Sequence, residues 1–367
     1  MSLSIVGLGT AVPPDAISAD DGLRIARYLA GPDVRTSDWL GPIYSNSGIR
    51  QRFQVIGGHV IRDLWAGTNV SGSPFLPSEF NEGRGPTTSE RMRIYAKEIG
   101  PLALRAARMA LEQSGFAAKA ITHIVTVSCT GFHAPGLDFT LIQELGLSPT
   151  VERTHVGFMG CHAALNGLRV ANAYTTADPD ARVLICAAEL CSLHYYYGSA
   201  ADKLVANAIF ADGAAAIVGT ANREPSQTWR VAATGSCVLP DSADAMGWLI
   251  GDHGFEMSLS RRVPEWIRGH LRPWLERWLA KHSRRLEEIG SWAVHPGGLK
   301  ILTAVEDGLE LPADALSASR AIYTEYGNMS SPTVVFVMDR LQKEGRPLPC
   351  VAMGFGPGLV VEAVLFE

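Results

Sequence analysis

Residues 157–188 of the chain read GFMGCHAALNGLRVANAYTTADPDARVLICAA. The glycine before Cys161 and the small, apolar residues after it predict a tight turn that leads into a helix. Residues 182–188 are almost wholly apolar, which is typical of a strand buried on both faces of a sheet. A buried strand that follows a helix is the unit from which layered α/β folds are built, so this stretch predicts an α/β protein.

The same alternation extends over the rest of the chain. Strands are expected at residues 4–8, 121–128, 214–218, 229–237, 290–294 and 350–366, the last as two runs separated by Gly-Phe-Gly-Pro-Gly. Helices are expected at residues 92–115, 261–286 and 331–343. Apolar strands that alternate with helices predict buried mixed sheets with helices on their outer faces.

Two stretches of biased composition indicate how the chain is divided. Residues 222–228 are polar, contain a proline and are the best candidate for a linker between residues 1–221 and 229–367. Residues 66–88 are rich in Gly, Ser, Pro and Asn and predict a long surface loop. The length of 367 residues predicts two or three domains of roughly 150 residues, or one large duplicated unit.

Composition and charge exclude several classes of protein. Hydrophobic residues make up 47% of the chain and charged residues 19%, which predicts a buried core rather than disorder. The net charge of −5 excludes nucleic-acid binding by bulk charge, so no nucleic-acid partner is expected. Apolar runs end well short of the ~18 residues that a membrane span needs, and the N-terminus lacks a secretory pattern, so we expect a cytoplasmic protein without membrane contact. The six cysteines form no C-x-x-C pair, which argues against a disulfide scaffold or a zinc knuckle.

Cys161 is the first candidate functional residue. At the start of a helix, the helix dipole and the free N–H groups lower the pKa of a thiol and favour the thiolate. The alternative is an ordinary buried cysteine at the start of a core helix, and this stretch alone does not separate the two. The adjacent His162 is not expected to act as its base, because neighbouring side chains on a helix point about 100° apart.

Two further motifs place polar residues at the ends of predicted elements. Residues 291–298 read SWAVHPGG and put His295 at the end of a strand, where Pro-Gly-Gly breaks it. Residues 326–333 read YGNMSSPT and put Asn328 in the loop before a helix whose first turn contains Pro332. Taken singly, His295 is either catalytic or structural, and Asn328 is either functional or a helix cap. Together, Cys, His and Asn in this order are typical of a nucleophilic active site.

These motifs resemble those of the type III polyketide synthases, the chalcone-synthase-like branch of the thiolase-fold condensing enzymes. The resemblance rests on GFMGCHAA around Cys161, on WAVHPGG, on GNMSSPTV and on GFGPGLVVE at residues 354–362. It runs nearly from end to end of the chain and includes Arg50, Arg52, residues 128–131, Glu189 and residues 210–213. It implies a thiolase-like layered αβαβα fold with two similar halves, of which the first carries Cys161 and the second carries His295 and Asn328.

The resemblance also implies roles for these residues. Cys161 would attack an acyl-CoA starter and hold it as a thioester, with His295 as the imidazolium partner of the thiolate. His295 and Asn328 would donate hydrogen bonds to the malonyl-CoA carbonyl that becomes an enolate on decarboxylation. Repeated condensation and cyclisation would give a pyrone, resorcinol, phloroglucinol or chalcone-type product. No metal or redox cofactor is expected, and the expected partners are the starter acyl-CoA, malonyl-CoA and a second copy of the chain.

Alignment with this family assigns further residues to the cavity and to the CoA site. The residues expected at the gate or on the cavity wall are Phe210, Met257, Cys129, Thr130, His194, Trp248, Ser330 and Pro357. Those expected to bind the CoA phosphates are Arg50, Arg52 and Lys300. Trp248 stands where plant members carry a glycine, which predicts a small or reshaped cavity and few extensions.

Three other functions fit parts of this pattern. A ketosynthase that performs a single condensation would share the three residues and release a linear β-keto product. A non-catalytic acyl-binding partner of the same fold would be favoured by loss of Cys161, His295 or Asn328, and all three are present. A cysteine protease also uses Cys, His and Asn, but the Ala- and Gly-rich helix after Cys161 argues against an open peptide groove.

Overall fold

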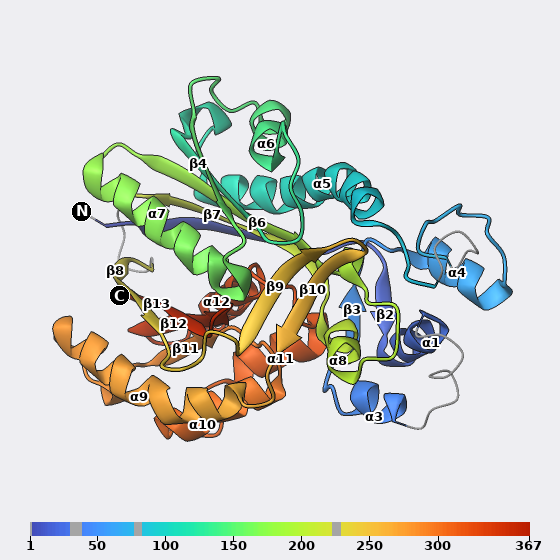
Figure 1. Ribbon diagram of the computed structural model, residues 1–367. Coiled ribbons are helices and arrows are strands. Elements are labelled where there is room, and N and C mark those ends of the chain that lie inside the picture. Colours follow the sequence, from blue (N-terminus) through green and yellow to red (C-terminus); the bar gives the residue numbers. More distant parts are fainter. Residues whose placement is uncertain (1, 30–38, 77–82, 222–228) are drawn as a thin grey trace.

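The computed structural model describes residues 2–29, 39–76, 83–221 and 229–367. The predicted linker at residues 222–228 lies outside these described residues. Two stacked sheets, with helices between and around them, make up the structure (Figure 1).

The first sheet has five strands in the order β1-β7-β6-β4-β5. β4 pairs in parallel with β5 and β6, whereas β7 is antiparallel to β6 and β1. The strands are β1 (Ser4–Ala11), β4 (His123–Ser128), β5 (Glu152–Gly157), β6 (Arg182–Leu190) and β7 (Asp212–Thr220). β4, β6 and β7 are buried along almost their whole length, as expected of strands that are covered on both faces.

The second sheet has four strands in the order β11-β12-β13-β8. β11 and β12 are parallel, and β13 is antiparallel to both β12 and β8. The strands are β8 (Val231–Val238), β11 (Ser291–Val294), β12 (Cys350–Gly356) and β13 (Val360–Phe366). Two short ladders stand apart from both sheets, namely β2 (Ala16–Ser18) with β3 (Gln51–Phe53) and β9 (Met246–Gly251) with β10 (Gly254–Leu259).

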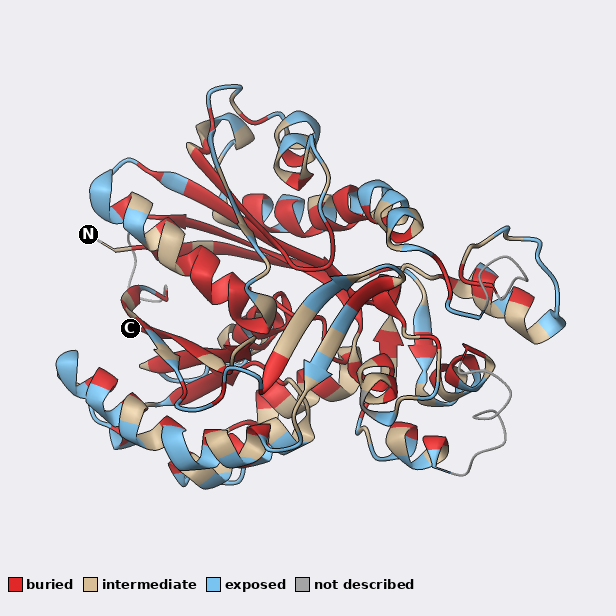
Figure 2. Ribbon diagram, viewed as in Figure 1, coloured by how far each residue is buried: buried red, intermediate tan, exposed pale blue. Residues whose placement is uncertain are grey.

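Helices form three layers about the two sheets. α5 (Thr88–Ser114) packs on the outer face of the first sheet, against β1, β6 and β7. α7 (Ala163–Ala177) and α12 (Thr333–Lys343) lie between the sheets and contact strands of both, and Figure 2 shows how deeply this middle region is buried. α9 (Val263–Lys281) and α10 (Leu299–Leu309) cover the outer face of the second sheet (Figure 1). This order confirms the layered αβαβα fold expected from the sequence.

The remaining helices surround these layers. They are α1 (Ala19–Leu29), α3 (Leu40–Ser45), α4 (Gly58–Ala66), α6 (Leu137–Leu145), α8 (Ala201–Ile209) and α11 (Ser317–Tyr326). The described residues between α4 and α5 contain no helix or strand, in keeping with the loop predicted at residues 66–88. Within the described ranges, every helix is too short or too polar to cross a membrane.

α9 and α12 begin two residues later than predicted, and the starts of α5 and α7 also differ from the prediction. α5 begins at Thr88 rather than at residue 92, because Thr87 and Glu90 form a capping box in which each side chain accepts the backbone N–H of the other. Cys161 lies in a 3-10 turn (Gly160–His162), and α7 begins only at Ala163. The candidate nucleophile therefore precedes the regular helix by two residues instead of forming its first turn.

β1 and α5 approach each other so closely that two glycines of β1 leave no room for a side chain. A Cβ on Gly7 would overlap the carbonyl oxygen of Ala110, and a Cβ on Gly9 would overlap that of Ala106. Because these neighbours are backbone atoms of a buried helix, they cannot move aside without disturbing the layer.

We predict that Gly9→Ala lowers the free energy of unfolding by about 1–3 kcal/mol, the usual cost of overpacking a core. The matched control is Gly269→Ala on α9, where a Cβ meets no atom within 4 Å. Helix propensity predicts that this control gains up to about 1 kcal/mol. Denaturant unfolding followed by circular dichroism measures both variants, and equal midpoints would contradict the packing argument.

Candidate active site

The turn that carries Cys161 is shaped by left-handed backbone on its N-terminal side. Phe158 has a φ of 59° and Gly160 a φ of 80°, so the chain turns sharply between β5 and α7. Packing also requires a glycine at position 160, since a Cβ there would overlap the ring of Pro357 from the GFGPG motif. The turn leaves Cys161 only 8% exposed.

The loop between α11 and α12 fixes Asn328 through its backbone. Asn328 N donates to Ile209 O (2.9 Å), and Asn328 O accepts from Ala211 N (2.8 Å). The side-chain Oδ1 accepts a hydrogen bond from Ser330 N (2.8 Å). The amide is therefore held with its Nδ2 donor on the other side, 3.4 Å from Gly297 O.

His295 directly follows β11, and its N donates to Met353 O of β12 (2.8 Å). A Cβ on Gly354 would lie 3.1 Å from His162 Cβ and 3.5 Å from His295 Cβ, so His295 packs beside the residue that follows Cys161. The ring is fully buried, and neither ring nitrogen has a hydrogen-bond partner among the described residues. A buried imidazole left unpaired is costly, and such groups in native structures need an explanation such as catalysis.

Burial dominates the protonation of both groups. It raises the pKa of Cys161 to about 11, and hydrogen bonds with the side chains of Ser330 and Asn328 offset only part of this rise. Burial, with a smaller contribution from His162, lowers the pKa of His295 to about 3. Each group taken alone is therefore neutral at pH 7. The helix start is expected to favour the thiolate, and burial acts against that effect.

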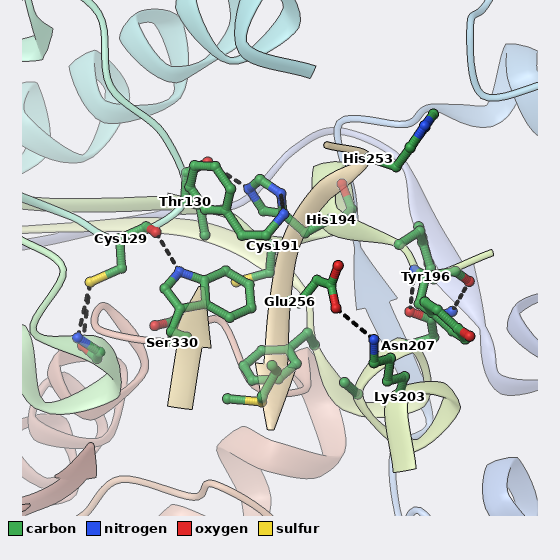
Figure 3. Close-up of a pocket in the computed structure, with 18 of the residues that line it drawn as sticks. Cys129, Thr130, Cys191, His194, Tyr196, Lys203, Asn207, His253, Glu256 and Ser330 are labelled. Atoms are coloured by element: carbon green, nitrogen blue, oxygen red, sulfur yellow. Dashed lines mark hydrogen bonds and ion pairs between the residues drawn. The ribbon is translucent and has the colours of Figure 1, made fainter. Parts of the chain in front are cut away.

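A cavity of about 430 Å³ opens onto Cys161, and Figure 3 shows the side chains around it. All eight residues expected at the gate or on the wall line this cavity, namely Cys129, Thr130, His194, Phe210, Trp248, Met257, Ser330 and Pro357. His295 and Asn328 are each 1% exposed and do not form part of the lining. Sequence reasoning missed a second group of lining residues, namely Cys191, Tyr195, Tyr196, Tyr197, Lys203, Asn207, Phe255 and Glu256. Among these, only the run of three tyrosines is visible as a pattern in the sequence.

One wall of the cavity consists of aromatic rings, and the ring nitrogens in it all form hydrogen bonds. Trp248 Nε1 donates to Cys129 O (2.8 Å). His194 Nε2 lies 2.7 Å from Thr130 O, and His194 Nδ1 accepts from Phe255 N (2.9 Å), so the ring carries its proton on Nε2. The His194 ring stacks on Phe255 at 4.2 Å and meets Trp248 edge-on at 5.5 Å. Burial lowers the pKa of His194 to about 3, which keeps this wall uncharged.

The buried carboxylate of Glu189 forms hydrogen bonds with residues that line the cavity. Its Oε2 accepts hydrogen bonds from Cys129 N (2.9 Å), Thr130 Oγ1 (2.8 Å) and Ser128 Oγ (3.3 Å). Its Oε1 accepts from Ser331 Oγ (2.8 Å) in the loop that carries Asn328. Burial raises the pKa of Glu189 to about 7 despite these hydrogen bonds.

The three residues expected to bind CoA differ in burial. Arg52 is 2% exposed, and its guanidinium donates to Asn207 O (2.5 Å), Phe210 O (2.8 Å) and Tyr195 Oη (3.3 Å). The prediction that Arg52 binds CoA phosphates is therefore wrong, because its donors hold the segment around Phe210 inside the fold. Arg50 and Lys300 are exposed, and neither lines the cavity.

Both parts of the chain match models of one protein family. Residues 4–222 match the N-terminal domain of chalcone and stilbene synthases, and residues 230–367 match the C-terminal domain of the same family.

Three known proteins illustrate the similarity. The 1,3,6,8-tetrahydroxynaphthalene synthase of Streptomyces peucetius subsp. caesius is 38% identical over 370 residues, which cover 99% of this chain and 93% of that protein. Polyketide synthase 37 of Dictyostelium discoideum is 34% identical over 76% of this chain, but the chain spans only 10% of that much longer protein. The crystal structure of PKS-I from the brown alga Ectocarpus siliculosus superposes with a TM-score of 0.92 at 31% identity, covering 100% of this chain and 98% of the other.

The raised pKa of Glu189 predicts that stability depends on pH. A carboxyl whose pKa is higher in the folded than in the unfolded chain binds its proton more tightly when folded. It therefore stabilises the fold most below its ordinary pKa of 4.5, and this contribution is lost as the pH rises to about 7. The full shift corresponds to about 3 kcal/mol.

We predict that Glu189→Gln, which keeps the shape but cannot titrate, flattens the loss of stability between about pH 5 and pH 8. Denaturant unfolding of both proteins at the two pH values measures the difference. Asp212, whose pKa burial raises to about 6, is unchanged in both proteins and cancels in the comparison. The same pH dependence in both proteins would contradict the role assigned to Glu189.

Proposed function

The chain belongs to the chalcone and stilbene synthase family of type III polyketide synthases, and on this premise we propose that Cys161, His295 and Asn328 form its catalytic centre. Enzymes of this family have a thiolase-like fold and are acyltransferases that build their products from malonyl-CoA. The observation that carries the proposal is that Cys161, which lines the cavity, is hydrogen-bonded to Asn328, while His295 is buried beside His162, the residue that follows Cys161. We further propose that residues 1–221 supply the nucleophile and residues 229–367 supply the histidine and the asparagine.

Loading transfers the starter acyl group from CoA to the protein. Cys161 Sγ attacks the thioester carbonyl, the thiol proton moves to His295, and CoA leaves as a thiol with that proton. Because burial disfavours either charge alone, thiolate and imidazolium form only as a pair, when the proton passes from one group to the other. The unpaired ring nitrogens of His295 support this role.

Extension requires a carbanion, which the loss of CO2 from malonyl-CoA supplies. The enolate oxygen left by decarboxylation accepts hydrogen bonds from the Nε2–H of His295 and the Nδ2–H of Asn328. The enolate carbon then attacks the Cys161 thioester, a C–C bond forms, and the C–S bond breaks to return the thiolate. Ser330 N already holds the Asn328 amide in position, so little reorganisation is needed. The atoms and electrons of these steps balance without a redox cofactor or a metal ion.

We also propose that the chain acts as a homodimer. β5 is the edge strand of the first sheet, and its residues are exposed or half-buried. Edge strands offer unpaired backbone groups to a second chain. Beside the end of β5, Met159 is 40% exposed and Phe132 is 47% exposed, and Phe132 packs on Phe158 at 5.5 Å between ring centroids. Exposed apolar side chains next to an unpaired edge support a second copy that covers both.

The proposed function predicts cyclic products that depend on Cys161. Purified protein, malonyl-CoA and a panel of aliphatic and aromatic acyl-CoA starters are analysed by mass spectrometry. We expect cyclic triketides or tetraketides from the wild type and none from Cys161→Ala, which lacks the nucleophile. His295→Gln should be slower by roughly 10²–10⁴-fold, the usual contribution of a general base.

Cys237→Ala is the matched control, because Cys237 lies on β8 and does not line the cavity. It should form products at the wild-type rate. Linear β-keto products from the wild type would identify a ketosynthase that condenses once. Full activity of Cys161→Ala would overturn the catalytic centre proposed above.

We predict that the side chain of Trp248 limits the length of the product. Its indole is held by Cys129 O and faces Met257 across the β9–β10 ladder, so it fills space beside the nucleophile. We expect Trp248→Gly to yield longer products, heavier by one or more malonyl-derived two-carbon units, because the lost ring makes room for them. Trp248→Phe, which keeps an aromatic ring, should shift the product masses less. Mass spectra identical to the wild type for Trp248→Gly would refute the idea that this residue limits chain length.

A further inference from the structure

A second histidine lies beside His295 in the layer between the two sheets. His162 ends the turn that carries Cys161, and it is only 1% exposed. β12 passes both histidines at Gly354, where a Cβ would lie 3.1 Å from His162 Cβ and 3.5 Å from His295 Cβ. The two imidazoles therefore extend from neighbouring points beside this strand.

The ring of His162 is held by α7 and β12 rather than by the cavity. Its Nδ1 lies 2.8 Å from Asn166 Oδ1, one turn further along α7, and it does not line the cavity. On the other side it faces Gly356 of β12, where a Cβ would lie 2.5 Å from Nε2. Because an amide oxygen only accepts hydrogen bonds, Nδ1 carries the proton of the neutral ring. A ring held in this way does not touch a substrate, but a charge on it reaches His295.

A buried carboxylate lies on the same face of the second sheet. Gly354 pairs with Glu362 in the antiparallel β12–β13 ladder, and paired residues present their side chains on one face. Glu362 is 2% exposed, and its carboxylate accepts hydrogen bonds from Arg169 on α7 and from Ser236 Oγ on β8 (2.8 Å). The negative charge of Glu362 favours protonation of His162, and the positive charge of Arg169 opposes it.

These neighbours decide which imidazole takes up a proton first. Burial lowers the pKa of His162 below its ordinary 6.5, but the hydrogen bond with Asn166 and the charge of Glu362 offset part of this fall. Burial lowers the pKa of His295 to about 3, and the charge of His162 adds to this fall. In mildly acidic solution, His162 is therefore the one that becomes charged.

A charge on His162 opposes the ion pair on which the proposed chemistry depends. Transfer of the Cys161 proton turns His295 into an imidazolium, and like charges that are close together in a dry site repel each other. The other partner of the pair faces Glu189, whose negative charge raises the pKa of Cys161. Formation of the pair is thus sensitive to one further positive charge beside His295.

We propose that His162 is a positioning residue for the reaction: its neutral ring lets His295 accept the proton of Cys161, and its charged ring prevents this transfer in mildly acidic solution. The inference rests on the proposed catalytic centre, because His162 acts only through the exchange of a proton between Cys161 and His295. No bond to His162 other than that to its own proton forms or breaks.

The test follows the reactivity of Cys161 without any polyketide product. Iodoacetamide alkylates the thiolate, a C–S bond forms and iodide leaves, and mass spectrometry measures the alkylation rate of Cys161 between pH 4.5 and pH 8. We expect the ratio of the rates at pH 8 and pH 5 to be about tenfold larger in the wild type than in His162→Gln or His162→Phe. Neither replacement can take up a proton, and comparison of the ratios cancels the ordinary ionisation of a thiol.

His123→Gln is the matched control. His123 is also a buried histidine, at 6% exposed, and its Nδ1 lies 2.8 Å from Thr122 Oγ1. It begins β4, whereas Cys129 follows the other end of that strand. This variant should keep the wild-type ratio, and circular dichroism at both pH values checks that each variant is folded.

The same ratio in the wild type and in a folded His162 variant would overturn the inference. The wild type tests it without any variant, because its rate should fall more steeply with pH below pH 6.5 than above it. A rate that changes evenly over the whole range would overturn the inference as well. Failure of the proposed function would instead appear as absence of a Cys161-dependent product from the starter panel, which alkylation does not require.

Discussion

The site depends on the hydrogen bonds that the buried carboxylate of Glu189 accepts. It joins the end of β4, through Ser128, Cys129 and Thr130, to the loop before α12, through Ser331. These segments come from the two parts of the chain that match separate family models, so this side chain links the two halves at the cavity. Burial raises the pKa of Glu189 to about 7, and its negative charge in turn raises the pKa of Cys161. The same group therefore shapes the cavity wall and adds to the burial that opposes ionisation of the nucleophile.

Desolvation is the reason why we propose that Cys161, His295 and Asn328 act only together. A thiol with a pKa near 11 and an imidazole with a pKa near 3 are poor nucleophile and poor base when each is taken alone. A proton transferred between them creates two opposite charges at once, and a dry site strengthens the attraction between those charges. The same dryness strengthens the hydrogen bonds that His295 and Asn328 offer to an enolate. Leaving the ring nitrogens of His295 without hydrogen-bond partners destabilises the folded state, and these are the nitrogens that we propose take part in the reaction.

The fold could be predicted, and the three residues proposed as catalytic could be singled out, because their signals are local. Buried strands such as β6 and β7 are short apolar runs, and the long helices elsewhere in the chain show the period of a helix. Cys161, His295 and Asn328 each lie where a glycine or a proline ends or begins an element. The role of Arg52 could not be predicted, because the oxygens that its guanidinium contacts belong to residues 143 to 158 positions away. The protonation states could not be predicted either, since they depend on burial, which no motif reports.

The packing around Cys161 allows no change of residue, whereas part of the cavity wall can change. Gly160 touches Pro357, and Gly356 touches the ring of His162, so closely that neither glycine can carry a side chain. Cys161 is therefore held between the terminal GFGPG motif and α7 by contacts that tolerate no added atom. Trp248, in contrast, belongs to the β9–β10 ladder, which stands outside both sheets. Residues of this ladder can change the cavity wall without moving the layers that position the nucleophile. A family built in this way can keep one reaction while its members differ in the starter they accept and the length to which they extend it.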